Sequence, residues 1–120
     1  MEYERAFVDA GGLLAAGVDP TGYGAAPPGY GDQRNYELLL EAGFTAPEVV
    51  QIMSHNGARI LGIDSDVGTV EAGKVADLVV IDADLEAAGN LHATEVVFRH
   101  GVGWDSPKLI ESIRGLVGVR

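Results

Sequence analysis

The order of apolar and polar positions divides the chain into a mainly helical first half and a mainly β second half, with a seam near Gly62. A short amphipathic helix is expected over residues 2–10, ended by a glycine pair. Residues 13–19 are apolar on both faces and end at a turn signal, which is typical of a strand covered on both sides in a parallel sheet. After a loop rich in glycine and proline, two further helices are expected over residues 34–42 and 46–61.

The helix expected over residues 46–61 carries the clearest local signals. Thr45 and Glu48 predict a capping box at its start. Four apolar residues fall within one sector of about 100° around the helix, namely Val49, Ile52, Met53 and Ile60. Asn56 lies in the middle of this stripe, and a buried amide needs hydrogen-bond partners. We therefore expect Asn56 to bind the backbone of a neighbouring segment.

β-Structure is expected after the seam. Residues 68–74 favour a short strand leading into a turn, and residues 76–82 are the clearest strand because they are rich in β-branched residues. A further strand is expected over residues 95–100. Ser106 and Pro107 then indicate the start of a terminal helix over residues 108–114.

Composition narrows the possible functions. The chain has 18 acidic and 8 basic residues, a net charge of −10, and its scattered Lys and Arg form no patch for nucleic acid. The absence of cysteine excludes disulfides, thiolate zinc sites and cysteine nucleophiles. The apolar runs are too short to span a bilayer, and the first residues do not resemble a signal peptide. We therefore expect a cytoplasmic protein that binds neither nucleic acid nor a membrane.

Asp19 is the first candidate for chemistry. It ends an apolar strand and precedes a glycine-rich loop, where α/β folds place their active sites. A carboxylate at this place can bind a metal or move a proton. The alternative interpretation is that Asp19 and Pro20 only start a turn.

The other titratable residues carry weaker signals. The three histidines, at positions 55, 92 and 100, show no metal-ligand spacing, and His55 is expected in solvent because it lies off the apolar stripe. The acidic run of Asp82, Asp84 and Glu86 is expected to form a solvated turn rather than a calcium loop.

Three segments resemble the metal-dependent amidohydrolase superfamily, in the same order and register. Residues 68–82 resemble its C-terminal signature, Gly-x-Ile/Val-x-x-Gly-Lys-x-Ala-Asp-Leu followed by an apolar strand. Residues 56–62 resemble its Asn-x-Ala-x-x-Leu-Gly helix end, and residues 16–19 are similar to Gly-Thr/Ser-Asp at the end of the eighth barrel strand. Within the superfamily, the chain most resembles the imidazolonepropionase-like group, which includes prolidase-type dipeptidases.

The resemblance implies an α/β fold with a β-sandwich portion. Residues 1–62 would be the end of a (β/α)8 TIM barrel, with its last strand at 13–19 and helices at 34–42 and 46–61. Residues 63–104 would be the C-terminal strands of a small composite β-sandwich, and residues 105–120 a C-terminal helix and tail. The other barrel strands have no counterpart in this sequence, so the resemblance implies a fragment and not a complete barrel.

The resemblance also implies a hydrolase that cleaves amide or peptide-like C–N bonds. Asp19 would be both a metal ligand and the catalytic carboxylate that moves a proton. The complete enzyme would use a divalent metal, zinc, and a small amide or dipeptide-like substrate. The remaining metal ligands of the family, including a His-x-His motif, have no counterpart here. This chain alone is therefore expected to bind no metal and to be inactive.

A single barrel strand would leave apolar edges uncovered, so a homo-oligomer is expected. Two alternatives to an enzyme fragment stay open. One is a non-catalytic, oligomerising interaction module derived from an amidohydrolase tail. The other is an acidic metal-binding module that combines Asp19 with the run of residues 82–86.

Overall fold

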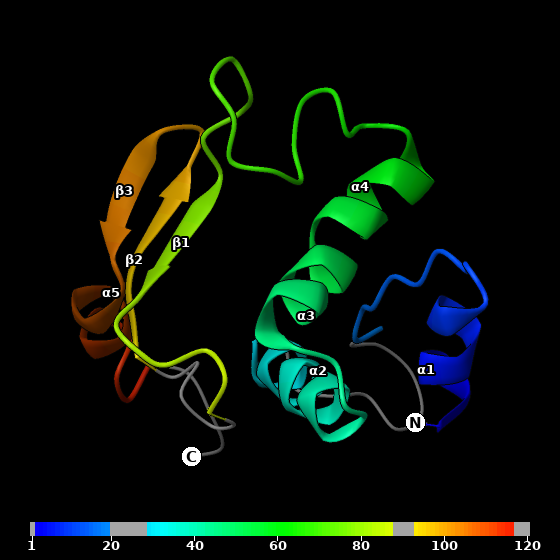
Figure 1. Cartoon of the computed structure of the whole chain (residues 1–120). Helices are drawn as coiled ribbons and strands as arrows, with labels where there is room; N and C mark the ends of the chain where they lie inside the picture. The colour runs from blue at the N-terminus through cyan, green and yellow to red at the C-terminus, as the bar shows by residue number, and fades with distance from the viewer. Residues whose placement is uncertain (1, 20–28, 88–92, 117–120) are drawn as a thin grey trace.

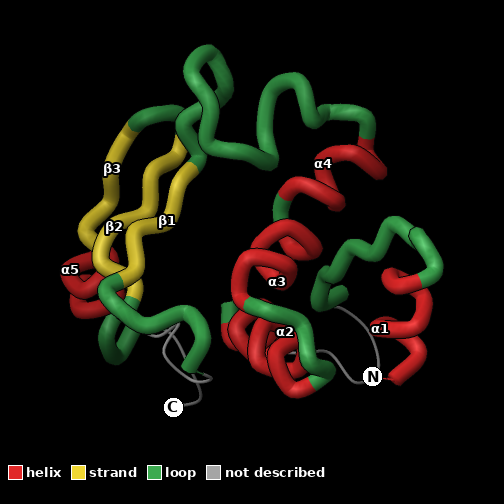
Figure 2. Tube along the Cα trace, viewed as in Figure 1, coloured by secondary structure: helices red, strands yellow, loops and turns green. Residues whose placement is uncertain are grey.

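The computed structural model of the chain describes residues 2–19, 29–87 and 93–116, in two neighbouring groups of elements (Figure 1). The first group is helical and the second is a small sheet with one helix; the loop after α4 connects them (Figure 2). The elements are α1 (Glu2–Asp9), α2 (Tyr30–Glu41), α3 (Ala46–Met53), α4 (His55–Leu61), β1 (Leu78–Ile81), β2 (Thr94–Arg99), β3 (Val102–Asp105) and α5 (Ser106–Ser112). None of the described helices is long and apolar enough to cross a membrane.

The core lies where α2 packs against α3. Gly43 has φ +87°, a left-handed conformation that glycine adopts without a steric penalty, and it turns the chain back after α2. The N–H of Phe44 then donates to the carbonyl of Leu39 at 3.2 Å. The buried cluster consists of Tyr36, Leu39, Phe44, Ala46, Val49 and Ile52, with Val49 fully buried.

The start of α3 is fixed by the capping box that the sequence predicts. The N–H and the hydroxyl of Thr45 both donate to Glu48 Oε2, at 2.8 and 3.0 Å. Arg5 of α1 also donates to this carboxylate, at 3.3 Å, and its guanidinium lies over the ring of Phe44. The backbone N–H of Thr45, then its hydroxyl, and then Arg5 hold the pKa of Glu48 below its ordinary value. One carboxylate thus joins the first turn of α3 to α1.

The prediction of one continuous helix over residues 46–61 is wrong, because the structure has two helices there. Ser54, at φ −123° and ψ −79°, ends α3, and α4 begins at the next residue. The hydroxyl of Ser54 donates to the carbonyl of Gly68 at 3.0 Å, a contact with a later loop that a local pattern does not contain. Because the helix restarts, Ile60 does not continue the apolar stripe of α3 and is 57% exposed.

The sheet is antiparallel in the order β1-β2-β3. β1 lies within the expected strand of residues 76–82, and β2 overlaps the expected strand of residues 95–100 but begins one residue earlier. β3 was not expected, and all four of its residues are exposed. His100 and Gly101, both with positive φ, form the two-residue turn between β2 and β3. The carboxylate of Asp77 holds this turn, accepting the N–H of His100 at 2.7 Å and an ion pair from Arg99.

Two expected strands are not formed. Residues 13–19 and residues 68–74 lie outside the one sheet of the described residues. A strand needs a neighbour for its backbone N–H and C=O groups, and no described segment supplies one to either stretch. The described residues therefore show helices beside a single antiparallel sheet, with neither a closed barrel nor a second sheet that would complete a sandwich. The helices of the first group otherwise differ from expectation in their limits, since α2 begins four residues earlier, at Tyr30.

We expect Val49→Ala to lower the free energy of unfolding by about 2 kcal/mol, because it leaves a cavity in the α2–α3 core. Urea denaturation followed by circular dichroism measures this change. The matched control is Val50→Ala on the same helix, where the side chain is 46% exposed, and it should alter stability by less than about 0.5 kcal/mol. Equal effects of the two substitutions would contradict this placement of the core.

Glu48→Gln should make the folding stability less dependent on acid pH. A carboxylate whose pKa is lowered in the folded state stabilises the fold above its ordinary pKa of 4.5, and this contribution is lost as the pH falls through the lowered value. The stability difference between the wild-type chain and this variant should therefore be larger at neutral pH than below pH ~4. Urea denaturation at a series of pH values measures it, with the exposed Glu95→Gln as control; a pH-independent difference would refute the assignment.

Candidate functional site

Asp19 is the last described residue of the segment that follows α1. Its side chain is exposed, and its φ of 41° places it in the left-handed region, which Asp enters more easily than most residues. The segment before it, residues 12–18, runs without a strand partner among the described residues. The structure therefore presents the Asp19 carboxylate at the end of an extended, unpaired stretch of chain.

Two asparagine side chains hold this stretch. Asn56 of α4 donates through Nδ2 to the carbonyl of Leu14 at 2.7 Å, which confirms the expectation that this amide binds neighbouring backbone. Asn35 of α2 donates through Nδ2 to the carbonyl of Gly17 at 3.0 Å, a bond that was not predicted from the sequence. Asn35 lies four residues before the buried Leu39, which places both residues on the same face of α2. A polar amide on that face was the sequence signal that could have pointed to Asn35.

The described residues do not fit a metal site by themselves. They contain no group of three or more His, Asp or Glu side chains close enough to hold an ion. A catalytic zinc site takes about three protein ligands and leaves one position open. Asp19 can contribute at most one of them, so the other ligands of any such centre have to come from elsewhere.

The acidic side chains of the run at residues 82–86 are exposed, as expected for a solvated turn, and Glu86 in addition binds another element. Glu86 accepts the backbone N–H of Ala46 at 3.3 Å and so lies at the N-terminus of α3, where a negative charge is favourable. The hydroxyl of Tyr36 donates to the carbonyl of Leu85 at 2.9 Å. Burial, and then the charges of Glu86 and Asp84, raise the pKa of Tyr36. The run thus ties the sheet to the helical core and does not approach Asp19 to form a metal site.

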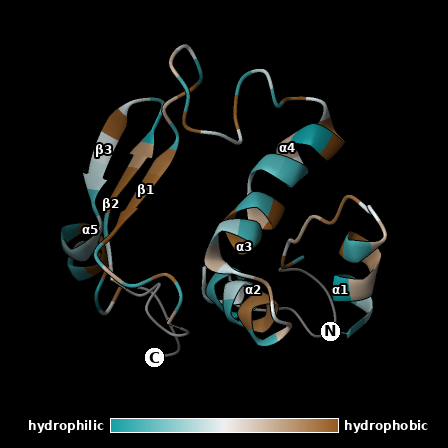
Figure 3. Ribbon diagram, in the orientation of Figure 1, coloured by the Kyte–Doolittle hydropathy of each residue, from teal (hydrophilic) through white to brown (hydrophobic). Residues whose placement is uncertain are grey.

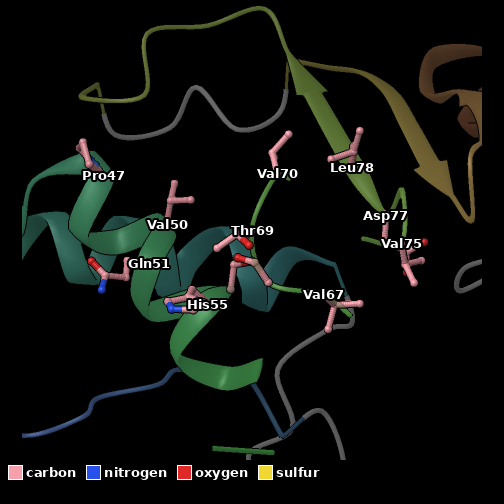
Figure 4. Close-up of a pocket in the computed structure, with 12 residues that line it drawn as sticks. Pro47, Val50, Gln51, His55, Val67, Thr69, Val70, Val75, Asp77 and Leu78 are labelled. Carbon is pink, nitrogen blue, oxygen red and sulfur yellow. The ribbon is translucent and has the colours of Figure 1, made fainter. Parts of the chain in front are cut away.

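A pocket of about 390 Å³ lies between the α3–α4 helices and residues 67–78 (Figure 4). Most of its lining is apolar, including Val50, Val70 and Leu78, whereas Gln51, Ser54 and His55 provide polar groups along its helical side. Asp19 is not among the lining residues. The pocket is therefore separate from the sequence-predicted site.

His55 is half-buried, so the expectation of a solvated histidine is wrong. Its Nδ1 is buried without a hydrogen-bond partner among the described residues. Gly68 covers this side of α4: it has φ +96°, and a Cβ added to it would lie 2.7 Å from the Cβ of Ala58. The loop of residues 67–69 can approach the helix this closely only because the residue is glycine. Of the other histidines, His100 is in the β2–β3 turn and His92 lies outside the described residues.

Lys74 and Asp77 serve the architecture of the loop and the sheet. Lys74 Nζ donates to the carbonyl of Asp64 at 2.8 Å and to the hydroxyl of Thr69. The N–H of His100, and then the charge of Arg99, hold the pKa of Asp77 below its ordinary value. Both side chains act on backbone and neighbouring side chains of their own region, so we assign them no chemistry.

Comparison with known proteins decides the family. The model of the amidohydrolase family matches residues 17–108, a range that contains Asp19, the helices α2, α3 and α4, and the sheet. The chain belongs to the amidohydrolase family. The match agrees with the resemblance drawn from the three sequence segments, and it extends through β3 to the start of α5.

Individual amidohydrolases show the same similarity. An imidazolonepropionase from Bdellovibrio bacteriovorus is 34% identical over 85 residues, which cover 67% of this chain and 19% of that protein. Among solved structures, a putative prolidase from Bifidobacterium longum is 33% identical with a TM-score of 0.70, covering 83% of this chain and 25% of the other. An adenosine deaminase from Xanthomonas campestris with bound zinc has a TM-score of 0.60 at 21% identity, covering 91% and 31%. The chain thus spans about a fifth of that curated relative and a quarter to a third of these solved amidohydrolases.

We expect the 120-residue chain to retain no stoichiometric zinc, because its described residues provide a single carboxylate at the candidate site. The measurement is the metal content by mass spectrometry after loading with zinc and dialysis. Asp19→Asn should give the same low content as the wild-type chain. One tightly held zinc per chain, lost in Asp19→Asn, would show that this chain forms a metal centre alone.

Proposed function

We propose that this amidohydrolase chain is the C-terminal part of a metal-dependent hydrolase that cleaves amide or peptide-like C–N bonds. The observation that carries the proposal is the family match over residues 17–108, which includes the candidate carboxylate. The proposed layout assigns residues 1–62 to the end of a barrel, residues 63–104 to a β-sandwich and residues 105–120 to a helix and tail. The overlap with solved amidohydrolases at TM-scores of 0.60 and 0.70 supports this layout.

Asp19 is the residue to which we assign chemistry. From its position a carboxylate can contribute one oxygen ligand to a divalent metal and can accept a proton. Zinc is the metal we propose for the complete enzyme, supported by the bound zinc of the Xanthomonas campestris adenosine deaminase. The remaining ligands would come from outside the described residues, which contain no group of metal-ligating side chains.

The substrate class we propose is a small molecule with an amide, cyclic amide or peptide-like C–N bond. The support is in the names of the similar proteins, an imidazolonepropionase and a putative prolidase. The pocket of Figure 4 does not include Asp19, so we do not assign the substrate to it.

The alternative is a non-catalytic module that associates through its sheet. The observation that favours it is the apolar surface of the strands: Val79 and Val80 of β1 and Val102 and Trp104 of β3 are all exposed. The hydrophobic colouring of β1 is visible in Figure 3. Such a surface fits either a second copy of this chain or further polypeptide of a larger enzyme.

The test is to read the DNA upstream of the first codon and to express the longest in-frame protein with zinc. If this protein contains a His-x-His motif and hydrolyses a cyclic amide, a dipeptide or an aminopurine nucleoside, Asp19→Asn should lower kcat by about 10²–10⁴-fold, because a carboxylate that moves a proton contributes that much.

The exposed Asp64→Asn is the matched control for loss of a charge and should leave kcat unchanged. An active enzyme that is insensitive to Asp19→Asn would refute the role of Asp19. A reading frame without any upstream barrel would favour the interaction module instead.

A further inference from the structure

We propose that Asn35 and Asn56 are positioning residues for Asp19: together they fix the chain that carries the carboxylate. The inference rests on the proposed function of Asp19, and it goes beyond that proposal by naming side chains that make no contact with the reacting groups. It starts from the two side-chain hydrogen bonds to the carbonyls of Leu14 and Gly17.

The segment before Asp19 depends on contacts with other elements for its position. Residues 12–19 belong to no strand of the described structure, so no sheet ladder sets their position. The carbonyl of Leu14 is partly buried, where a backbone group requires a hydrogen-bond partner, whereas the carbonyl of Gly17 is bound at the surface. Two side-chain amides donate to these carbonyls, and they come from two different helices, α2 and α4.

The environment of Asn56 indicates that its side chain serves as a hydrogen-bond donor to the backbone. Its side chain is 7% exposed and lies on α4 beside the buried Ala58. Its Nδ2 reaches Leu14 at 2.7 Å, while its Oδ1 is buried without a partner among the described residues. An amide with one oxygen unpaired costs stability compared with an apolar side chain of similar size. The bond to the Leu14 carbonyl is the compensating interaction that the structure shows.

Asn35 acts close to the carboxylate. Its bond to Gly17 is two residues from Asp19, a span of at most roughly 7 Å in an extended chain. The same helix carries the buried Tyr36 and Leu39, so this donor belongs to a helix that packs into the core. Motion of the Asp19 backbone is thereby limited relative to the helical core.

The backbone conformation of Asp19 is consistent with a segment that its surroundings hold in place. Its φ of 41° is unusual for a residue other than glycine, and such conformations persist where the surroundings determine them. The hydrogen bonds from Asn56 and Asn35 hold residues just before Asp19 and so can determine its backbone conformation. Asn35 and Asn56 thus fix the direction from which the carboxylate enters a site.

The experiment uses the isotope-labelled 120-residue chain and solution NMR. The variants are Asn35→Asp, which replaces the donor by an acceptor of the same size, and Asn56→Leu, which removes both polar atoms. Two readouts are compared: the intraresidue amide-to-Hα NOE of Asp19, which is strong at positive φ, and the heteronuclear 1H–15N NOE of residues 15–19, which falls when the backbone becomes mobile. The amides of Val49 and Ile52 report on the core.

In Asn35→Asp we expect a weakened intraresidue NOE at Asp19 and heteronuclear NOE values for residues 17–19 that fall to about half of those of the wild-type chain, with Val49 and Ile52 unchanged. Asn35→Gln keeps an amide donor and should restore part of both signals. Gln51→Ala, which removes an exposed amide from α3, is the matched control and should change neither readout.

Unchanged readouts at residues 15–19 in both variants would overturn the proposal. So would parallel changes at Val49 and Ile52, because they would show that the asparagines stabilise the whole helical group and not the segment of Asp19. If Asn56→Leu does not fold, Asn35→Asp alone decides. The NMR result needs neither metal nor substrate, so it can fail or succeed independently of the activity test of Asp19→Asn.

Discussion

The packing of α2 against α3 around Val49 is the constraint on which the described structure depends. Gly43 permits the tight reversal between these helices, and the capping box of Thr45 and Glu48 fixes where α3 begins. Two long-range contacts of the helical group are made to this unit: Arg5 joins α1 to it, and Tyr36 joins the loop after β1 to it. The position of the candidate carboxylate is set by reference to the same two packed helices and their continuation in α4.

The residues that identify the family and the residue that would perform its chemistry are different. The conspicuous signature of residues 68–82 is explained by architecture, because Gly68 lets a loop lie on α4 while Lys74 and Asp77 hold the loop and the β2–β3 turn. Asp19 belongs to a much weaker sequence pattern. Recognition of the family from the signature therefore says more about how the loop and sheet are assembled than about catalysis.

Local patterns predicted the features that depend on local interactions. The capping box at Thr45, the β1 and β2 strands and the buried amide of Asn56 all follow from residues close together in the sequence. The break at Ser54, the contact of Glu86 with α3 and the bond from Asn35 to Gly17 join segments 14 to 40 residues apart, and a single sequence contains no record of such pairings. For the candidate site, the sequence singled out Asp19 and Asn56, because Asn56 lies in the middle of a recognisable apolar stripe. Asn35 was missed, because no such stripe was recognised around it.

The placement of the single tryptophan separates the optical signals of the two groups of elements. Trp104 is on β3 and is 51% exposed, whereas the helical core contains the buried Tyr36 and no tryptophan. Indole fluorescence consequently reports on whatever contacts the sheet, and the loss of helical order is followed by far-ultraviolet circular dichroism. Covering of the strands by another polypeptide and melting of the helices can thus be observed separately in one sample, without an added label.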